Sequence, residues 1–278
     1  MAREKPTVAL VGAGKLAGFL APALAGAGYR ISEIIARANA GSMKRAGTLA
    51  RRVGARAVTV GAAALDAELL WFAVPDGEIR RAAESLGRRA KAFGAKSSGA
   101  RSSGARASRV RFAFHASGVL GSGELASLRK AGVAVASVHP LMTFVAGVRP
   151  SLAGVPFAVE GDAAAVRSAR TLVRKLGGNS FVLSSRRKAA YHAWATMASP
   201  LLVAYLVTLE EAARAARLGR EQARRMSLPI LRQTLENYAR LGPGNSFSGP
   251  FVRGDAETVA KHLALLQRNP RTRGVYVA

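Results

Sequence analysis

The segment that most constrains the fold of this chain is its run Val-Ala-Leu-Val-Gly-Ala-Gly-Lys-Leu-Ala at residues 8–17. Four apolar residues predict a buried strand, and the Ala/Leu-rich stretch that continues to Gly28 predicts a helix. Between strand and helix, Gly12 permits a tight turn, Gly14 lets the backbone approach a pyrophosphate, and Ala17 allows close packing of the helix on a sheet. In this context the pattern predicts a dinucleotide site formed by Gly12, Ala13, Gly14, Lys15, Leu16 and Ala17.

Apolar runs alternate with helical segments over residues 1–184. We expect strands at 31–36, 57–60, 69–74, 110–115, 133–138, 157–159 and 181–183, and helices at 42–53, 124–130 and 163–175. This alternation implies right-handed crossovers, and therefore an α/β Rossmann domain with a doubly wound, mainly parallel sheet. Residues 94–108 interrupt it with two copies of Ser-Ser-Gly-Ala-Arg, which we expect to form an inserted basic surface loop.

Strand signals stop near residue 184, so residues 185–278 are expected to form an all-helical substrate-binding and dimerisation domain. Helices are predicted at 188–218, 222–241 and 257–268, the first kinked by Pro200 because proline lacks a backbone donor. Residues 189–209 carry no formal charge and could span a bilayer by length. The polar residues inside that run favour a helix buried at an interface, so no membrane association is expected.

The end of the second predicted strand bears on which nicotinamide nucleotide would bind. A site for NAD normally places Asp or Glu there to bond the ribose hydroxyls, whereas this sequence has Arg37. A guanidinium can pair with a 2′-phosphate, so NADP is expected rather than NAD. Val74, Pro75 and Asp76 end the strand at 69–74 and are also expected to contact the cofactor, since carboxyl ends of parallel strands share one edge.

Two later strands place polar residues at this same edge. Ser117 and Gly118 follow the strand at 110–115, bringing a hydroxyl and a close-approach glycine near the nicotinamide. His139 follows the strand at 133–138, where a neutral imidazole could donate to a substrate carbonyl or imine. We therefore predict catalytic roles for Ser117 and His139 and a substrate contact for Gly118.

The chain resembles bacterial proteins that join a Rossmann-like NADP-binding domain to a helical C-terminal domain of unknown function. They belong to the wider class of pyrroline-5-carboxylate reductase-like and 6-phosphogluconate-dehydrogenase-like enzymes. The resemblance rests on several blocks in order: residues 12–17, 74–76, 115–118, 137–144, 191–193 and 249–255. It implies that the helix carrying His192, Thr196 and Ser199 forms the far wall of the cleft, with a catalytic role for His192 and substrate contacts for Thr196 and Ser199. It also implies a homodimer.

One departure from the related hydroxyacid dehydrogenases leaves the activity open. Those enzymes carry a catalytic lysine and asparagine on this wall, whereas residues 189–209 contain no lysine and Pro200 stands where the close family usually has asparagine. Two interpretations remain: an NADP-dependent oxidoreductase that transfers hydride to or from a small C=N or C=O compound, or a non-catalytic NADP-binding regulator or sensor.

The charge of the chain supports a third interpretation. Its 42 Lys and Arg residues against 16 Asp and Glu residues give a formal net charge of +26, which attracts polyanions. Non-specific nucleic-acid binding is therefore possible, with the loop at 94–108 as a candidate contact. The absence of cysteine excludes disulfides and thiolate sites, and no spacing of histidines and carboxylates predicts a metal. Residues 1–29 imitate a secretory signal, but Lys15 and the glycine pattern interrupt it, so a cytoplasmic protein is expected.

Overall fold

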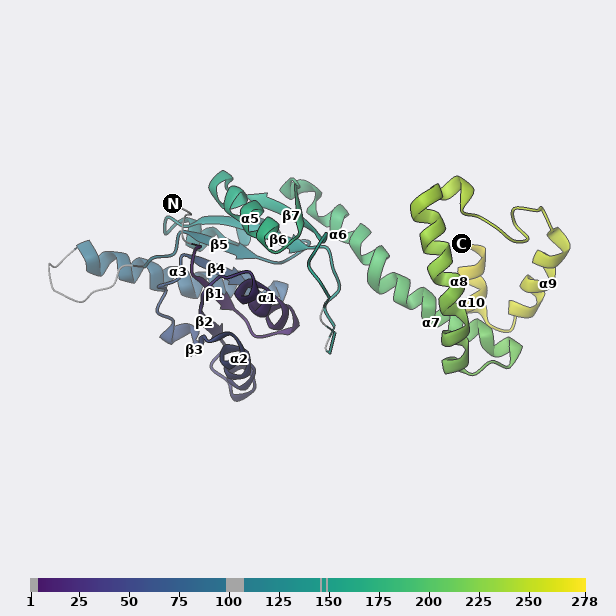
Figure 1. The fold of residues 1–278 in the computed structure, drawn as a ribbon, viewed down its shortest axis with the longest axis horizontal. Coiled ribbons are helices and arrows are strands. Elements are labelled where there is room, and N and C mark those ends of the chain that lie inside the picture. The colour runs from purple at the N-terminus through teal and green to yellow at the C-terminus, as the bar shows by residue number, and fades with distance from the viewer. Residues whose placement is uncertain (1–4, 99–107, 146, 149) are drawn as a thin grey trace. The chain divides into compact units, whose positions relative to one another are not determined.

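The computed structural model describes residues 5–98, 108–145, 147–148 and 150–278. The chain divides into two compact units, Met1–Ala195 and Thr196–Ala278, and each is described by itself. The first unit contains the sheet, and the second is helical (Figure 1). The predicted α/β Rossmann fold with a helical C-terminal part is confirmed.

The first unit is built on one eight-stranded sheet in the order β3-β2-β1-β4-β5-β6-β7-β8. The strands are β1 (Val8–Val11), β2 (Ile31–Ala36), β3 (Arg56–Thr59), β4 (Leu69–Phe72), β5 (Phe112–His115), β6 (Ala134–Pro140), β7 (Pro156–Gly161) and β8 (Asn179–Val182). Neighbouring strands are parallel except for the antiparallel pair β6 and β7. The chain passes from β3, at one edge of the sheet, back to β4 beside β1, so the strand order reverses between β1 and β4, the point at which open α/β sheets bind ligands.

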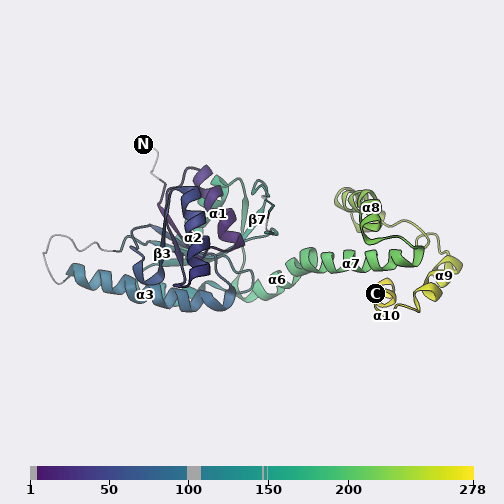
Figure 2. The same cartoon turned by 90° about the horizontal axis from the view of Figure 1, so that it is seen from below.

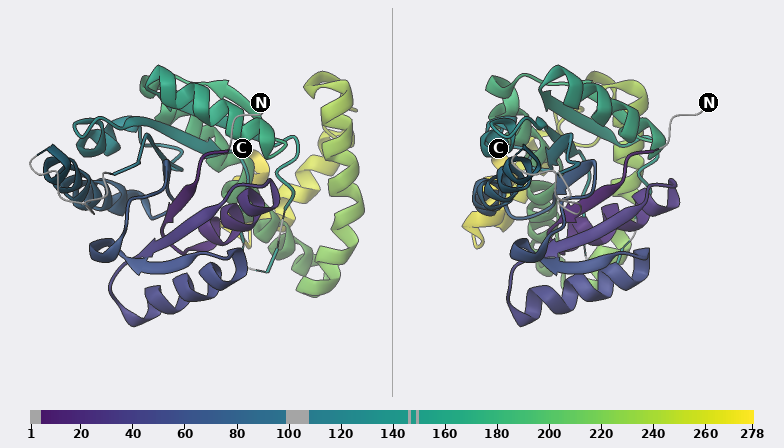
Figure 3. Two further views of the ribbon diagram at one scale, coloured as in Figure 1. Left: turned by 60° about the vertical axis from the view of Figure 1, so that its left-hand side comes forward. Right: turned by 90° about the vertical axis from the view of Figure 1, so that its left-hand side faces the viewer.

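Helices cover both faces of this sheet (Figures 2 and 3). Helices α1 (Lys15–Gly26), α2 (Ala40–Val53) and α5 (Ala163–Lys175) pack on one face, and α3 (Asp76–Ser98) and α4 (Ala126–Arg129) pack on the other. Side chains alternate between the two cores, so Val8 and Leu10 face α1 while Ala9 and Val11 face α3. Burying a side chain of this size contributes about 1.5–3 kcal/mol, which accounts for the apolar character of β1.

Two local expectations for this unit need correction. Helix α3 begins at Asp76, directly after the fourth strand, and continues to Ser98, so residues 94–98 are helical rather than part of a surface loop. The run Ala-Lys-Ala-Phe-Gly-Ala-Lys at 90–96 is rich in helix formers and allows that extension. The remainder of the predicted loop lies almost entirely outside the described residues. The helix expected at 124–130 is divided between a 3₁₀ turn, Ser122–Leu125, and α4.

A continuous helical run leads from the first unit into the second. Helix α6 (Lys188–Thr196) is followed by a π-helical turn at Met197–Leu201 and then by α7 (Leu202–Ala213). The wide turn accommodates Pro200, whose ring would clash with the carbonyl of Thr196 in a regular α-helix. The residues Ser185–Ala216 are long and apolar enough to cross a membrane, by length and composition alone.

Three further helices complete the second unit: α8 (Arg220–Leu241), α9 (Ala256–Leu266) and α10 (Pro270–Val277). Helix α10 was not expected from the sequence, although Asn269 caps it by accepting a hydrogen bond from the Thr272 amide at 3.2 Å. Pro270 occupies its first position, which proline favours. Asp255 caps α9 in the same way.

Candidate functional site

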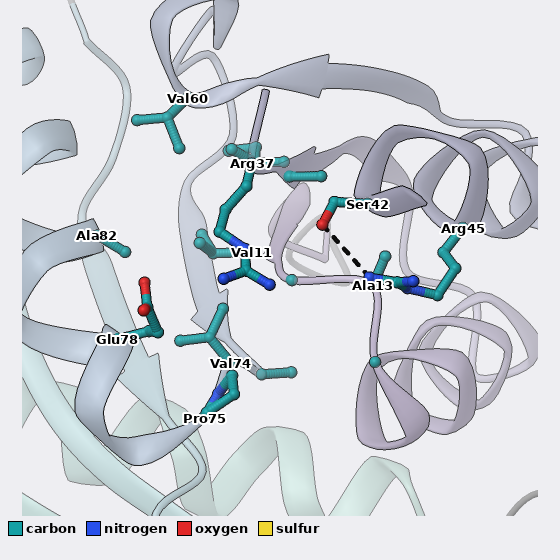
Figure 4. Close-up of a pocket in the computed structure, with 15 residues that line it drawn as sticks. Val11, Ala13, Arg37, Ser42, Arg45, Val60, Val74, Pro75, Glu78 and Ala82 are labelled. Carbon is teal, nitrogen blue, oxygen red and sulfur yellow. Dashed lines mark hydrogen bonds between the residues drawn. The ribbon is translucent and has the colours of Figure 1, made fainter. Parts of the chain in front are cut away.

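A pocket of about 200 Å³ opens at the carboxyl edge of the sheet, beside the crossover between β1 and β4 (Figure 4). Its walls come from the ends of β1, β2 and β4 and from the first turns of α2 and α3. Among the residues that line it are six of the predicted cofactor contacts: Gly12, Ala13, Gly14, Arg37, Val74 and Pro75. The structure therefore brings together side chains and backbone that are up to 63 positions apart in the sequence, from Gly12 to Pro75.

The two glycines of the turn meet different demands. Gly12 has φ = 108°, and a Cβ there would lie 2.5 Å from the carbonyl oxygen of Ala73, so the fold itself requires glycine. At Gly14 the nearest atom to an added Cβ is that same oxygen at 4.0 Å, so the fold leaves the space open. Helix α1 begins at the next residue, and no side chain caps it. An open space at an uncapped helix N-terminus suits a bound phosphate group.

Two guanidinium groups and a hydroxyl project into this pocket from its other side. Arg37 follows β2, while Ser42 and Arg45 lie on the first turns of α2 (Figure 4). Arg45 donates to the Ser42 hydroxyl at 3.3 Å, which orients its side chain. This set of donors fits a phosphate monoester, because guanidinium groups pair with its oxygens in a fixed geometry. Of the two basic residues near the start of α2, Arg45 lines the pocket and Lys44 does not.

Sequence reasoning missed the acidic residue of this pocket. Glu78 projects into it from the first turn of α3 and faces the Arg37 side chain across the space (Figure 4). Apolar surface from Val60 and Ala82 lies beside it. The carboxylate adds an acceptor for hydroxyl or amino groups to a pocket that otherwise presents donors. Its position three residues after Pro75 was the only signal in the sequence.

The other predicted cofactor residues lie outside the pocket lining. Ala17 is fully buried against the sheet, as close packing of α1 requires, and Leu16 packs at the margin of the same core. Lys15 is exposed. Asp76 accepts a hydrogen bond from the Ser117 hydroxyl at 2.9 Å, and thereby connects the pocket to a second group of polar residues.

This second group, the histidine cluster, comprises Ser117, Gly118, His139, Tyr191 and His192. His139 Nδ1 lies 2.8 Å from the Tyr191 hydroxyl, and the rings of His139 and His192 have centroids 6.0 Å apart. The backbone of Gly118 approaches both imidazoles so closely that an added Cβ would overlap His192 Cδ2 and lie 2.9 Å from His139 Nε2. Four of the residues predicted to act on substrate are thus brought together, and Tyr191 joins them.

Burial keeps His139 and Tyr191 uncharged. It lowers the pKa of His139 to about 4, with the positive charge of Lys188 acting in the same direction. It raises the pKa of Tyr191 to about 12. Near neutral pH the pair is therefore a neutral imidazole hydrogen-bonded to a neutral phenol. Such a pair can donate a hydrogen bond to a carbonyl or imine without introducing a charge.

His115 and Ser117 hold the turn that carries Gly118. The Ser117 amide donates to His115 Nδ1 at 3.2 Å, so the ring proton lies on Nε2, which is 3.0 Å from the carbonyl oxygen of Gly121. Desolvation lowers the pKa of His115 to about 4, consistent with this neutral tautomer. The Ser117 hydroxyl also accepts from the Leu120 amide at 3.0 Å. The polar atoms of both side chains are thus occupied by hydrogen bonds to the backbone and to Asp76.

A buried lysine at the base of the cluster was also missed. Lys188 is only 1% exposed, and its ammonium donates to the Ser137 hydroxyl at 2.8 Å and to the carbonyl oxygen of Ser117 at 3.1 Å. Burial lowers its pKa to about 8. Lys188 lies directly before the interval 189–209, which contains no lysine. Lys188 is the first residue of α6, and its two hydrogen bonds connect this helix to β6 and to the turn that follows β5.

The remaining predicted substrate contacts belong to the second unit. Thr196 ends α6 and Ser199 lies in the π-helical turn. They stay predictions. Within the residues that the structure describes, no group of three or more histidines and carboxylates could hold a metal ion.

Comparisons with known proteins address the fold. Residues 155–278 match the model of a family described as a domain of unknown function, DUF2520. No curated protein matches the sequence. A Bacteroides fragilis protein, provisionally named an NADP oxidoreductase, is 19% identical with a TM-score of 0.73, covering 98% of this chain and 95% of that one. A pyrroline-5-carboxylate reductase from Coxiella burnetii is 14% identical with a TM-score of 0.62, covering 98% and 96%.

An imine reductase from Myxococcus stipitatus, solved with NADP⁺, is 15% identical with a TM-score of 0.65, covering 97% and 90%. A variant of an imine reductase from that organism has been solved with NAD⁺. At these identities the likenesses establish the fold, and they extend over nearly the whole of each chain. Together with the DUF2520 match they confirm the resemblance drawn from the sequence: a Rossmann-like domain followed by a helical domain of unknown function.

Proposed function

We propose that this chain, whose C-terminal part is a DUF2520 domain, is an NADPH-dependent reductase of a small C=N or C=O compound. One observation carries the proposal. A pocket with the donor set for a phosphorylated dinucleotide is connected, through Pro75, Asp76 and Ser117, to a cluster of neutral proton donors at the same sheet edge. The fold neighbours include a pyrroline-5-carboxylate reductase and an imine reductase, which favours a C=N substrate.

The residues of the pocket fit NADP(H) part by part. The pyrophosphate would lie over Gly14 at the start of α1, and Arg37 and Arg45 would hold the 2′-phosphate. When bound, the nucleotide supplies or accepts the hydride. Because Arg37 stands where a site for NAD normally places Asp or Glu, NADPH is preferred over NADH.

The histidine cluster orients the substrate and transfers the proton: as His139 Nε2 gives its proton to the reduced nitrogen or oxygen, Nδ1 takes the Tyr191 hydroxyl proton, and Tyr191 regains a proton from solvent. With Tyr191, which burial keeps protonated, as the donor to His139 Nδ1, the ring proton lies on Nε2, the atom facing Gly118. Nε2–H donates to the substrate nitrogen or oxygen, and His192 borders the same space. Lys188 and Ser117 act as positioning residues, since their polar atoms are committed to Ser137, Asp76 and the backbone.

The test is NADPH oxidation in the presence of cyclic imines, keto acids and aldehydes, with NADP⁺ reduction by hydroxy acids as the reverse direction. We expect turnover with at least one C=N or C=O class, and its loss in His139→Phe with the affinity for NADPH retained. Binding of NADPH without turnover in any class would instead support a regulator or sensor. Tyr238→Phe, on α8 in the second unit, is the aromatic control and should leave turnover unchanged.

We also propose that the chain forms a homodimer through its second unit. Met197, Leu201, Val203 and Tyr205 are each about half exposed or more, and no residue in the apolar window of the helix is buried within the described chain. Apolar surface of this extent marks an interaction site. Light scattering after size-exclusion chromatography should give twice the mass of 29.0 kDa. A monomeric mass, or partition of the protein into vesicles, would refute the dimer.

A further inference from the structure

A second hollow in the first unit lies far from the pocket along the sheet, where α5 meets β8. We call it the arginine groove. Its lining residues are Arg167, Arg170, Thr171, Arg174, Gly178, Asn179 and Ser180. None of these is acidic and none has an aliphatic or aromatic side chain, so the groove presents polar groups, three of which are guanidinium donors. Strand β8 ends the sheet, and within the described residues no further strand covers it.

The helical register explains why the arginines gather here. Arg167, Arg170 and Arg174 are spaced i, i+3 and i+7, which places them on one face of α5. The opposite face, with Ala169 and Leu172, is buried against the sheet. The three guanidinium groups are exposed, and none takes part in the ion pairs found among the described residues.

The local charge is uncompensated over a long segment. Residues 163–188 contain seven Lys and Arg residues and no Asp or Glu. Asp162, just before the helix, is already paired with Arg129 at 3.0 Å. The groove therefore contributes a concentrated positive surface to a chain whose net charge is +26. A surface of this kind accumulates polyanions from solution.

We propose that the arginine groove binds the phosphate backbone of a nucleic acid, as a site separate from the cofactor pocket. The seven helical steps from Arg167 to Arg174 span about 10 Å, and a duplex strand presents a phosphate about every 3.4 Å of its axis, so the three arginines extend along about four consecutive phosphates. Hydroxyl and amide groups from Thr171, Asn179 and Ser180 are further phosphate donors. None of the described residues that line the groove is aromatic, and contacts to phosphates alone carry no sequence information, so binding is independent of sequence.

The lining favours nucleic acid over a membrane. Helices that bind membrane surfaces insert an apolar face between the lipids, whereas the apolar face of α5 is already buried in the protein. The tandem Ser-Ser-Gly-Ala-Arg repeat, the sequence candidate for the same role, lies largely outside the described residues and forms no part of this site.

The test measures binding of the full chain to a fluorescent DNA duplex of arbitrary sequence by anisotropy over a range of salt. The variant is Arg167→Gln/Arg170→Gln/Arg174→Gln. The control is Lys44→Gln/Arg51→Gln/Arg52→Gln on α2, which removes the same charge outside both hollows. Losing three phosphate contacts lowers the salt slope by about 2.7, so a fourfold rise in salt should weaken the wild type roughly 40-fold more than the groove variant.

Two outcomes would overturn the proposal directly. The first is an unchanged affinity of the groove variant for the duplex. The second is an equal loss of affinity in the α2 control, which would show that only the net charge matters. Phosphatidylserine vesicles and inorganic phosphate serve as further probes. If the groove variant loses vesicle or phosphate binding but keeps duplex binding, the groove is not a nucleic-acid site. An Arg→Lys triple variant, which keeps the charge, should retain most of the affinity. Unchanged melting temperatures show that each variant is folded.

Discussion

Replacing each glycine of the β1–α1 turn by alanine separates the needs of the fold from those of a ligand. At Gly12 the new Cβ would lie 2.5 Å from the Ala73 carbonyl oxygen, in a backbone conformation with φ = 108°. Strained dihedrals cost about 1–3 kcal/mol and overpacking a further 1–3 kcal/mol. Gly12→Ala should therefore lose about 2–6 kcal/mol of unfolding free energy, and its Tm should fall by roughly 5–20 °C.

At Gly14 the backbone is extended and an added Cβ meets nothing nearer than 4.0 Å. Gly14→Ala should change the unfolding free energy by less than about 0.5 kcal/mol. Its Cβ would occupy the space assigned to the pyrophosphate, so the affinity for NADPH should fall at least tenfold, or about 1.4 kcal/mol. Gly26→Ala, at the open end of α1, is the control and should alter neither quantity.

Urea denaturation and calorimetric titration of the three variants give both numbers. Wild-type affinity for NADPH in folded Gly14→Ala would show that the open space is not a ligand site. An unchanged Tm in Gly12→Ala would refute the steric reasoning itself.

Three further predictions concern charge and buried polar groups. Arg37→Asp should weaken NADPH binding by roughly 10- to 150-fold while sparing NADH, because one charged hydrogen-bond set is lost; equal losses for both nucleotides by titration would contradict this. Lys188→Met should lower kcat with little change in NADPH affinity, and should cost about 1–3 kcal/mol, since Ser137 and the Ser117 carbonyl lose their buried donor; an unaltered kcat would exclude a positioning role. His115 has a folded-state pKa of about 4 against 6.5 when unfolded, so the unfolded state binds its proton more readily. This stability is present above pH 6.5 and is lost as pH falls toward 4, by roughly 2 kcal/mol between pH 7 and pH 5. Because the pKa of His139 is also lowered to about 4, it adds a loss of similar size, so urea unfolding at the two pH values should show a loss in the wild type that exceeds the loss in His115→Gln by roughly 2 kcal/mol.

The fold followed from local patterns because the strands of a buried parallel sheet are continuous apolar runs. Leu69–Phe72 and Ile31–Ala36 could be recognised without knowing their partners. The glycine turn was equally local, since strand, turn and helix are consecutive. Helix α10 was missed because it is short and weakly amphipathic, although Asn269-Pro270 is a start signal for a helix.

The residues of the site could be predicted only where they lie at the carboxyl edge of the sheet. Arg37 and Ser117 follow strands, and His139 lies near the end of β6, so the topology alone placed them at one edge. Lys188 and Tyr191 lie on helix α6, so the tendency of functional residues to follow the carboxyl ends of strands could not predict them. Glu78 was missed because its role depends on which side of α3 faces the pocket.

The arginine groove could not be recognised in the sequence at all. Three arginines on one helix face are common in a chain with this net charge, and they usually form a solvated surface. Only the fold shows that this face borders a hollow beside the last strand of the sheet.

Calorimetric titration of the wild-type chain with NADPH and with NADH tests the central claim most directly. The pocket at Gly12, Gly14 and Arg37 predicts one saturable binding event for NADPH and a clearly weaker one for NADH. Failure of both nucleotides to bind at concentrations well above the micromolar range typical of such enzymes would contradict it.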